Sequence, residues 1–286
     1  MNRTDICEIL INRLGVADFM HKPMAANAPA RFYFNEEYQR ELEDDLSRTG
    51  NYEAFAGNEL KPASKNCQAP KMCSVVSSSR LCYLYFSDKN KFMERVEFEK
   101  KMPILKDPRA TPPHLDACIE NALSVTYYEC KCCEIFDRHS LDMSVSYEKK
   151  LKSLGVKNVD DKKIKNRSFK LTAEDFGLTE KIVHFDFGQL FRHLLGIVNA
   201  VDKLDKTHIL QYLFFIPCEA YKLSKEYPAY IGVLNKLEDE INDIWNSEII
   251  ERLKKSGLNE VMLPPPRFVP VTDIHDRVLT RLVTSR

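Results

Sequence analysis

The sequence lacks several features that would place it in a specialised class of protein. Its 286 residues include no apolar stretch of membrane-spanning length, and the first twenty carry charged residues among the apolar ones, unlike a signal peptide. Basic and acidic residues balance at 42 each, so no net charge holds the chain on nucleic acid or on an anionic membrane. These absences predict a cytoplasmic protein with no membrane partner, on which any phosphate-binding surface is local.

The sequence is also poor in glycine, and its cysteines do not indicate disulfide bonds. Only 9 residues are glycine and 44% are hydrophobic, which favours one substantial core. The nine cysteines follow no export signal, so we expect free thiols rather than a disulfide framework. We therefore predict a single domain over residues 1–286, with a helical extension at 1–50, a core at 51–217, and a helical extension and tail at 218–286.

The apolar pattern predicts an α/β fold. Four segments have the composition of strands, and these are Arg80–Phe86, Val96–Ile104, His114–Glu120 and Val125–Cys133. An amphipathic helix is expected over Asp186–Asn199, followed by a buried strand over His208–Ile216. A strand, a helix and a buried strand in this order are typical of a crossover, so the central sheet should be mixed.

Helical spacing also marks both ends of the chain. Helices are expected over Thr4–Val16, Glu36–Leu46 and Tyr230–Leu253. The last of these is long enough to cap the core or to form a dimer contact. Residues 51–76 predict loops with a short helix near Glu53–Leu60, and residues 149–170 predict an exposed, locally basic excursion. The proline-rich segment that starts at Leu263 is interpreted as a linker or an edge segment.

The segment HLDACIENALSVTYYECKCCE predicts a β-hairpin that gathers charged side chains. A turn centred between Ala122 and Leu123 places Asp116 across from Glu129. Lys131 projects from the same face as Glu129, because side chains alternate along a strand. Two like charges on neighbouring strands repel each other unless a positive group lies between them. A divalent cation, Mg²⁺ or Mn²⁺, suits such carboxylate ligands.

This arrangement would support phosphodiester hydrolysis. A bound metal lowers the pKa of a water and offsets charge on the phosphate, while Lys131 orients the water or stabilises the transition state. The tripeptide Glu-x-Lys also occurs at Glu99/Lys101 and Glu148/Lys150, so the setting in a hairpin gives the motif its weight. The alternative is an ordinary cross-strand ion pair on a solvated face.

Leu115-Asp116, twelve intervening residues and Glu129-Cys130-Lys131 resemble the motif of the PD-(D/E)xK nuclease superfamily, with Leu115 in place of proline. Further segments resemble proteins predicted to be restriction endonucleases in bacterial genomes, and these are GNEL, KMCSVVSSSRL, FEKKMP, YECKCCEIFDRH and FDFGQLFRHLLGI. The resemblance implies a restriction-endonuclease-like core, with a central mixed sheet flanked by helices and extra helices at both termini. It also implies that Glu59 is the acidic residue of the first helix and completes the metal ligands. An ordinary exposed acid is the equal alternative for Glu59.

Other residues are candidates for the same site. Gln189 and His193 lie four apart on the predicted helix, where they would hold a phosphate or a water. The alternatives are a capping-box partner of Asp186 for Gln189 and a boundary residue for His193. Candidates for contact with the DNA backbone are Ser77, Ser78, Ser79 and Arg80. Their alternative is an ordinary loop before a strand.

Two further clusters have simpler explanations. The first is the basic run Lys162, Lys163, Lys165 and Arg167. It fits contact with a nucleic-acid backbone, although solvated charge is the more usual explanation. The second is Cys130, Cys132 and Cys133 with His139 nearby. The cysteines lack the two-residue gap and the second pair of structural zinc sites, so we interpret them as small core residues.

Together the residues and the resemblance predict a Mg²⁺- or Mn²⁺-dependent deoxyribonuclease, similar to type II restriction endonucleases and belonging to a bacterial restriction-modification system. The expected catalytic residues are Asp116, Glu129, Lys131 and Gln189, and the expected metal ligands are Glu59, Asp116 and Glu129. The partners would be DNA and a divalent metal, with a homodimer as one arrangement for addressing two strands. The alternatives are a catalytically inactive nuclease fold that binds nucleic acid or a partner protein, and a zinc-stabilised structural protein.

Overall fold

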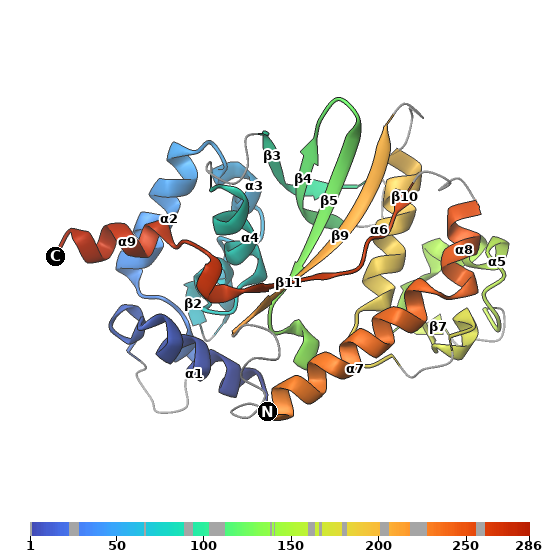
Figure 1. Ribbon diagram of the computed structural model, residues 1–286, viewed down its shortest axis with the longest axis horizontal. Helices are drawn as coiled ribbons and strands as arrows, with labels where there is room; N and C mark the ends of the chain where they lie inside the picture. The colour runs from blue at the N-terminus through green and yellow to red at the C-terminus, as the bar shows by residue number, and fades with distance from the viewer. Residues whose placement is uncertain are drawn as a thin grey trace.

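The computed structural model arranges the chain around one central β-sheet with helices on both faces (Figure 1). It describes residues 2–22, 29–65, 67–88, 94–102, 112–137, 139, 141–159, 164–165, 168–178, 182–200, 206–217, 228–255 and 261–286. The expected α/β class with a mixed sheet is confirmed.

The central sheet has an antiparallel half and a parallel half. Its strands are β3 (Val96–Lys101), β4 (His114–Glu120), β5 (Ser124–Lys131), β9 (Thr207–Ile216), β10 (Val261–Met262) and β11 (Arg267–Pro270). β3, β4 and β5 form an antiparallel meander, and β9 lies parallel to β5. β10 and β11 pair in parallel with the beginning and the end of β9. The crossover between β5 and β9 was expected from the strand, helix and strand order.

Helices flank this sheet and extend from it at both ends of the chain. They are α1 (Arg3–Leu14), α2 (Glu36–Arg48), α3 (Tyr52–Ala56), α4 (Ser78–Phe86), α5 (Glu148–Ser153), α6 (Phe187–Ala200), α7 (Pro228–Trp245), α8 (Glu248–Lys255) and α9 (Arg277–Thr284). Two small sheets add β1 (Pro62–Ser64) with β2 (Cys67–Pro70), and β6 (Leu141–Ser144), β8 (Ser168–Leu171) and β7 (Ile164–Lys165) in that order.

The two faces of β5 meet different helices, because its side chains alternate in direction. On one face Tyr128 packs its ring 4.5 Å from that of Phe86 on α4, measured between centroids. On the other face Glu129 accepts a hydrogen bond from Gln189 on α6. Tyr128 therefore faces α4 and Glu129 faces α6, and the hairpin's charged residues Asp116 and Lys131 lie on the same face as Glu129.

The prediction of a strand over Arg80–Phe86 is wrong, because this segment forms most of α4. Ser77 caps the helix, its side-chain oxygen accepting a hydrogen bond from the Arg80 backbone N–H at 3.1 Å. Nearly every residue of α4 is buried, so the sequence shows an unbroken apolar run without helical periodicity. A run of this length fits a buried strand or a buried helix equally well, and the serine cap decides between them.

Two other predicted segments also differ from the structure. The helix expected over Tyr230–Leu253 is interrupted after Trp245, where the Ser247 hydroxyl donates to the Ile244 carbonyl and α8 begins in a new direction. The stretch expected as an exposed excursion at 149–170 contains α5, β7 and part of β8. Its buried residues include Leu151, Leu154, Val156 and Val159. These few apolar positions suffice to anchor a segment that is otherwise highly charged.

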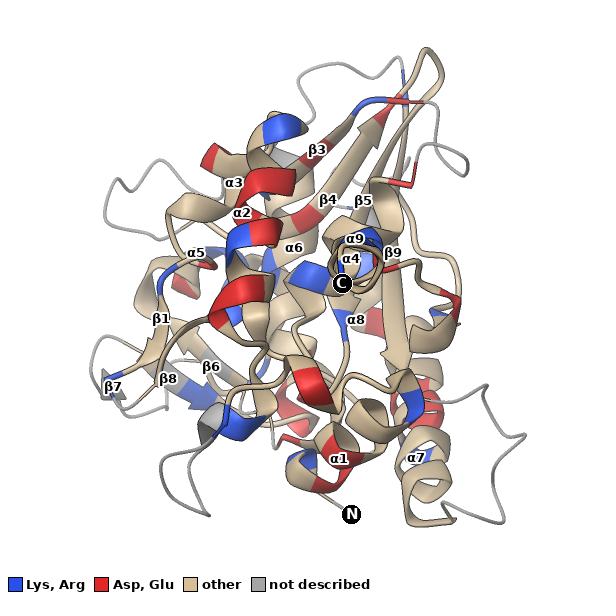
Figure 2. Cartoon of the chain, turned by 90° about the vertical axis from the view of Figure 1, so that its left-hand side faces the viewer, with Lys and Arg blue, Asp and Glu red and all other residues tan. Residues whose placement is uncertain are grey.

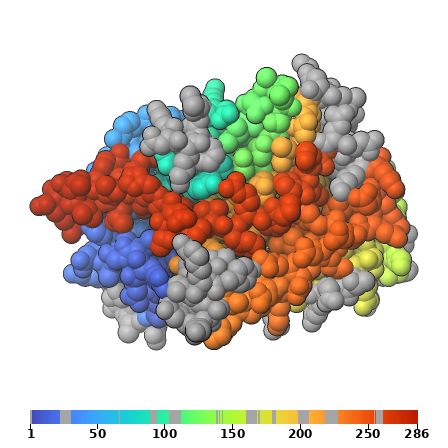
Figure 3. All heavy atoms as spheres, in the orientation of Figure 1, coloured from blue at the N-terminus to red at the C-terminus, as the bar shows by residue number. Residues whose placement is uncertain are grey.

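The C-terminal segment crosses one face of the molecule and ends on α2 (Figure 3). β11 adds an edge strand to the sheet, as one of the two interpretations of the proline-rich tail proposed. Beyond it, Arg277 and Arg281 of α9 pair with Asp45 of α2 at 2.7 and 2.8 Å. Asp45 also accepts a hydrogen bond from the Tyr83 hydroxyl at 2.7 Å. This network joins α2, α4 and α9.

Burial is continuous from the first helix to the last. The buried apolar residues from Ile6 on α1 to Leu282 on α9 belong to one hydrophobic cluster. All eight cysteines in the described part of the chain are buried free thiols. Among the described residues, every helix is too short or too polar to span a lipid bilayer.

Candidate functional site

Four side chains form a row across neighbouring strands of the central sheet. They are Glu99 on β3, Asp116 on β4, Glu129 on β5 and Tyr212 on β9. Residues on either side of Glu99 pair with those on either side of Asp116. The β4–β5 register, continued by one residue, sets Asp116 across from Glu129, and Glu129 pairs directly with Tyr212. The hairpin register is therefore the one that the turn predicts.

Asp116 is anchored to the backbone of the adjacent strand. Its Oδ2 accepts a hydrogen bond from the Cys130 N–H at 2.6 Å, just beyond the last regular pair of the β4–β5 ladder. The side chain therefore reaches across to β5 instead of extending into solvent. One carboxylate oxygen is used in this way, and no described residue donates a hydrogen bond to Oδ1.

Glu129, Lys131 and Gln189 are joined by three short hydrogen bonds. The Lys131 ammonium donates to Glu129 Oε1 at 2.6 Å and to Gln189 Oε1 at 2.7 Å. The Gln189 amide donates to the same Glu129 oxygen at 2.8 Å. Glu129 is 2% exposed, and its Oε2 is buried without a hydrogen-bond partner among the described residues. One oxygen of Glu129 is thus held by the protein, and the other is available to a cation.

The structure shows the cap that Asp186 forms on the backbone of Gln189. The expected role of the Gln189 side chain, holding a phosphate or a water, stays a prediction. Asp186 caps α6, its Oδ1 accepting a hydrogen bond from the Gln189 backbone N–H at 2.8 Å. The cap uses only the backbone of Gln189, so the amide side chain remains free to reach Lys131 and Glu129. Glu240 on α7 supports the preceding segment, because its carboxylate accepts hydrogen bonds from three successive N–H groups at residues 183–185.

His193 lies behind Glu129, away from the surface. The residue is 1% exposed, and its Nδ1 is 3.7 Å from Glu129 Oε2. Burial lowers the pKa of His193 well below its usual range, and the nearby Lys131 lowers it further. The expected contact with nucleic acid is therefore wrong. The imidazole of His193 lies buried beside Glu129, and neither ring nitrogen has a hydrogen-bond partner among the described residues.

Burial and mutual repulsion shift the pKa values of the carboxylates in this row. Burial raises the pKa of Asp116 well above its usual range, and the carboxylates of Glu129 and Glu99 raise it further. Burial also raises the pKa of Glu129, against the opposing effect of Lys131. Burial lowers the pKa of Lys131, but the surrounding carboxylates outweigh this and raise it. Excess negative charge in a buried site favours a bound cation.

Glu99 belongs to this site, although the sequence pattern did not single it out. Burial raises its pKa to about 8, and the carboxylates of Glu59 and Glu129 add to the effect. Its backbone has a φ of 51°, in the left-handed region that non-glycine residues seldom adopt. Residues at such angles often lie at functional sites. The signal was available only through the β3–β4 register, which a long connection leaves unspecified in sequence.

Glu59 lies beside the row, at its edge. It follows α3 in a turn instead of standing on the helix, and its carboxylate accepts a hydrogen bond from the Asn58 amide at 2.7 Å. It is near enough to Glu99 to raise that residue's pKa. In Figure 2 acidic positions are visible on β3 and β4, and β3 also carries Lys100 and Lys101.

The predicted contact between Arg80 and a DNA backbone is wrong. Arg80 is 1% exposed, and its guanidinium donates to Asp276 at 3.0 Å and to the Val75 carbonyl at 3.0 Å. Ser77, the cap of α4, is also buried. Ser78 donates to Glu134 at 2.8 Å, and all three serines line a cavity of about 280 Å³ together with Lys71. Ser77, Ser79 and Arg80 are therefore buried, and Ser78 is the one of the four that is partly exposed.

The remaining clusters from the sequence fall outside the site. Lys162, Lys163 and Arg167 lie outside the described residues, and Lys165 is described only as part of β7. Cys130, Cys132 and Cys133 are buried, as their interpretation as core residues requires. His139 makes contacts with Asp186 and with the Glu134 carbonyl instead of with these cysteines.

The carboxylate oxygens at this site suit Mg²⁺ better than a metal ion that must be held by protein ligands alone. No group of three His, Cys, Asp or Glu side chains in the described part of the chain is arranged to hold a metal ion by itself. Mg²⁺ commonly takes only one or two carboxylates and completes its shell with waters and substrate phosphates. Asp116 and Glu129 supply two carboxylates, and the buried Oε2 without a partner is the atom that such an ion would satisfy.

Gly196 sets how closely α6 approaches the sheet. A Cβ at this position would lie 2.8 Å from the Cβ of Met102, which follows β3. Gly196→Ala should therefore push α6 outward and destabilise the protein by about 1 kcal/mol, after the gain in helix propensity offsets part of the overpacking. Gly232→Ala on α7 is the matched control. A Cβ there meets nothing within 4 Å, so it should stabilise by about 0.5–1 kcal/mol. Urea unfolding measures both, and equal effects would contradict this account of α6.

Comparison of the chain with protein-family models, with curated proteins and with solved structures finds no match. Its function therefore has to be inferred from the chemistry of the site.

Proposed function

We propose that the protein is a metal-dependent nuclease that hydrolyses phosphodiester bonds in DNA. The observation that carries the proposal is the hairpin itself: Asp116 lies across from Glu129, with Lys131 on the same face and bonded to Glu129 at 2.6 Å. This arrangement agrees with the resemblance of the sequence to the PD-(D/E)xK superfamily. The order of a helix, three antiparallel strands, a helix and a parallel strand, here α4, β3, β4, β5, α6 and β9, supports a restriction-endonuclease-like core.

In this proposal Asp116 and Glu129 hold a divalent cation, Mg²⁺ or Mn²⁺. Such an ion supplies two kinds of chemistry, activation of a water and stabilisation of charge on the phosphate. Glu59 and Glu99 lie at the far side of Asp116, where their charge adds to the attraction for a cation. His193 and Gln189 keep Glu129 in place by flanking its two oxygens.

Lys131 is the residue of this site to which the proposal gives a defined chemical role. Its raised pKa keeps it protonated at neutral pH, so it acts as a hydrogen-bond donor and a positive charge rather than as a base. Two of its three N–H groups are used by Glu129 and Gln189, which fixes the direction of the third. The positive charge of an ammonium held in this way stabilises negative charge on a phosphate without reorganising during the reaction.

The direct test of the proposed function is cleavage of supercoiled plasmid DNA by the purified protein. We expect nicked or linear plasmid with Mg²⁺ or Mn²⁺ and intact plasmid when EDTA is present, because Asp116 and Glu129 repel each other without a cation. Plasmid that stays intact with both metals, over a range of protein concentrations, would contradict the proposal. Single-stranded DNA and RNA in parallel reactions define the substrate.

A second candidate function is a nuclease-like fold that binds nucleic acid or a partner protein without cutting. The absence of a three-ligand metal group among the described residues favours it. A protein of this kind would show no rise in melting temperature on addition of Mg²⁺ or Mn²⁺, whereas a functional site gains stability from the bound ion.

A further inference from the structure

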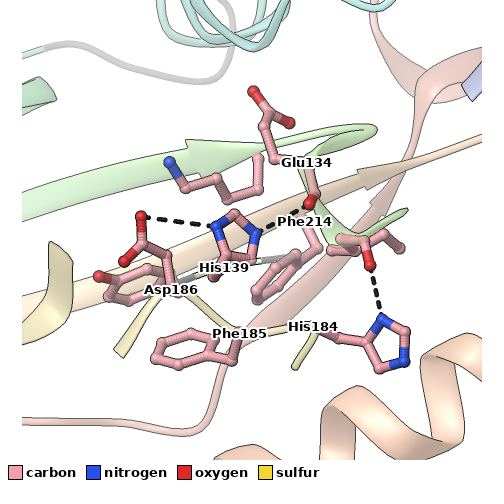
Figure 4. A pocket seen from close by; sticks show the side chains of 9 residues that line it. Glu134, His139, His184, Phe185, Asp186 and Phe214 are labelled. Atoms are coloured by element: carbon pink, nitrogen blue, oxygen red, sulfur yellow. Dashed lines mark hydrogen bonds and ion pairs between the residues drawn. The ribbon is translucent and has the colours of Figure 1, made fainter. Parts of the chain in front are cut away.

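A cavity large enough for one water has Lys131 in its wall (Figure 4). Its volume is about 10 Å³, close to the minimum that a single water requires. The residues that line it are Lys131, Glu134, Ile135, His139, His184, Phe185, Asp186, Tyr212 and Phe214. Lys131 belongs both to this wall and to the hydrogen-bonded group with Glu129 and Gln189.

Two polar groups in its wall have unused hydrogen-bonding capacity. Tyr212 is 1% exposed, and its hydroxyl has no hydrogen-bond partner within the described residues. Buried tyrosine hydroxyls almost always find a partner, and an ordered water is the usual one when no protein group is near. Lys131 has one N–H group left after its bonds to Glu129 and Gln189. A water in the cavity would satisfy both groups.

His139 in the same wall is arranged to accept a proton. Its Nε2 lies 2.9 Å from the Glu134 carbonyl oxygen, and since a carbonyl only accepts, this nitrogen carries the hydrogen of the neutral ring. The lone pair of Nδ1 is then directed toward Asp186, whose Oδ2 is 3.6 Å away. Asp186 is itself fixed as the cap of α6. Protonation at Nδ1 would create an ion pair with a carboxylate already in position.

His184 lines the same cavity but lacks this arrangement. Its Nδ1 lies 2.8 Å from the Ile135 carbonyl oxygen, and its ring points away from Asp186 (Figure 4). The two histidines therefore share a cavity wall and differ in the one feature that matters, a carboxylate facing the free nitrogen. His184 is a matched control for His139.

We propose that the cavity water relays a proton from the attacking water to Nδ1 of His139. The inference rests on the proposed nuclease function. As the oxygen of the attacking water forms its bond to phosphorus, one of its O–H bonds breaks, and the proton passes through the cavity water to His139. The bond from phosphorus to the leaving oxygen breaks, and this oxygen takes a proton from solvent. The His139 side chain is 19% exposed, so it returns its proton to bulk water.

These separate roles for Lys131 and His139 agree with the contacts that Lys131 makes. Lys131 donates hydrogen bonds to Glu129 and Gln189 and serves here as a donor, so the reaction needs another group to accept the proton. His139 is the imidazole in the same cavity that has a carboxylate facing its unprotonated nitrogen. Tyr212 and Lys131 position the water, and His139 receives the proton.

The test compares His139→Ala, His139→Gln and His184→Ala with the wild type in plasmid cleavage, with and without added imidazole. Loss of a proton acceptor should slow cleavage by about 100-fold in both His139 variants. Imidazole should restore activity to His139→Ala, which leaves space for it, but not to His139→Gln, which fills the space. His184→Ala should cut at nearly the wild-type rate, and melting temperatures show which variants are folded.

Three outcomes decide the matter. A folded His139→Ala that is slow and is rescued by imidazole supports the relay. A folded His139→Ala or His139→Gln that cuts like the wild type, or a slow His139→Ala that imidazole does not rescue, overturns it while the nuclease function stands. Failure of the wild type to cut overturns the nuclease function and the relay together.

Discussion

Asp116→Asn is expected to abolish metal-dependent cleavage while leaving the metal-free protein at least as stable as the wild type. The carboxamide keeps an oxygen to accept the hydrogen bond from the Cys130 N–H but loses the charge that holds the cation. Burial and the nearby carboxylates raise the pKa of Asp116, so its negative charge opposes folding when no metal is present. We expect a fall in cleavage rate of at least about 100-fold, comparable to removing a charge-stabilising group from an active site. Plasmid assays and thermal melts measure the two effects.

Matched substitutions elsewhere separate this effect from a general loss of charge. Glu129→Gln and Lys131→Met should lose cleavage to a similar degree, because both remove a charge from the same hydrogen-bonded group. Glu148→Gln and Lys150→Ala alter the same tripeptide pattern on α5 and should leave cleavage unchanged. An Asp116→Asn protein that is folded and cuts at the wild-type rate would show that the hairpin carboxylates do not hold the catalytic metal.

Asp45→Ala is expected to destabilise the fold by about 3 kcal/mol. Asp45 accepts hydrogen bonds from Tyr83, Arg277 and Arg281, and its side chain is 3% exposed. Breaking a buried ion pair leaves uncompensated charge and costs about 3–5 kcal/mol. The lower value applies because both arginines retain some contact with water. Urea unfolding gives the difference in free energy.

Asp44→Ala is the control, since Asp44 is the exposed neighbour of Asp45 on the same helix. It should change stability by less than about 0.5 kcal/mol. Burial raises the pKa of Asp45, but hydrogen bonds from Arg277, Tyr83 and Arg281 outweigh this and lower it. The stabilisation is therefore present above the usual carboxyl pKa of about 4 and is lost as the pH falls below it. A difference between wild type and Asp45→Ala that persists unchanged at lower pH would contradict this role.

The sequence predicts the part of the site whose geometry depends on the position of a single turn. Asp116 and Glu129 belong to adjacent strands joined by a short loop, so the position of the turn fixes their register. Lys131 follows from alternation along the same strand. The position of Glu99 depends on a second register, the one between β3 and β4. The connection between these strands is too long for the sequence to specify that register. Its charge was visible in the sequence, but its place in the row was not.

The fold was predictable where the apolar period was clear. In α6 the apolar residues recur at helical spacing around the polar Gln189 and Arg192, whereas the run Leu81–Phe86 in α4 is unbroken and shows no period. The role of Arg80 was hidden for the same reason. Its partner Asp276 lies almost two hundred residues away in α9, and only the folded structure brings the two together. Long-range contacts of this kind leave no local pattern in the sequence.

Helix α6 also contributes to the site, and strand pairing alone does not predict this contribution. Gln189 and His193 of α6 lie against Glu129, so this carboxylate is covered rather than exposed. This burial is what turns ordinary acidic residues into groups with raised pKa values. The solvated ion pair considered as the alternative at the sequence level is inconsistent with a Glu129 that is 2% exposed.

Titration of the metal-free protein with Mn²⁺ by calorimetry measures cation binding at the hairpin most directly, because it requires neither a substrate nor a catalytic step. The wild type is expected to bind Mn²⁺, Glu129→Gln to bind at least about tenfold more weakly, and Glu148→Gln to bind like the wild type. Equal Mn²⁺ affinity in the wild type and Glu129→Gln, or no binding to either, would contradict a cation site between Asp116 and Glu129.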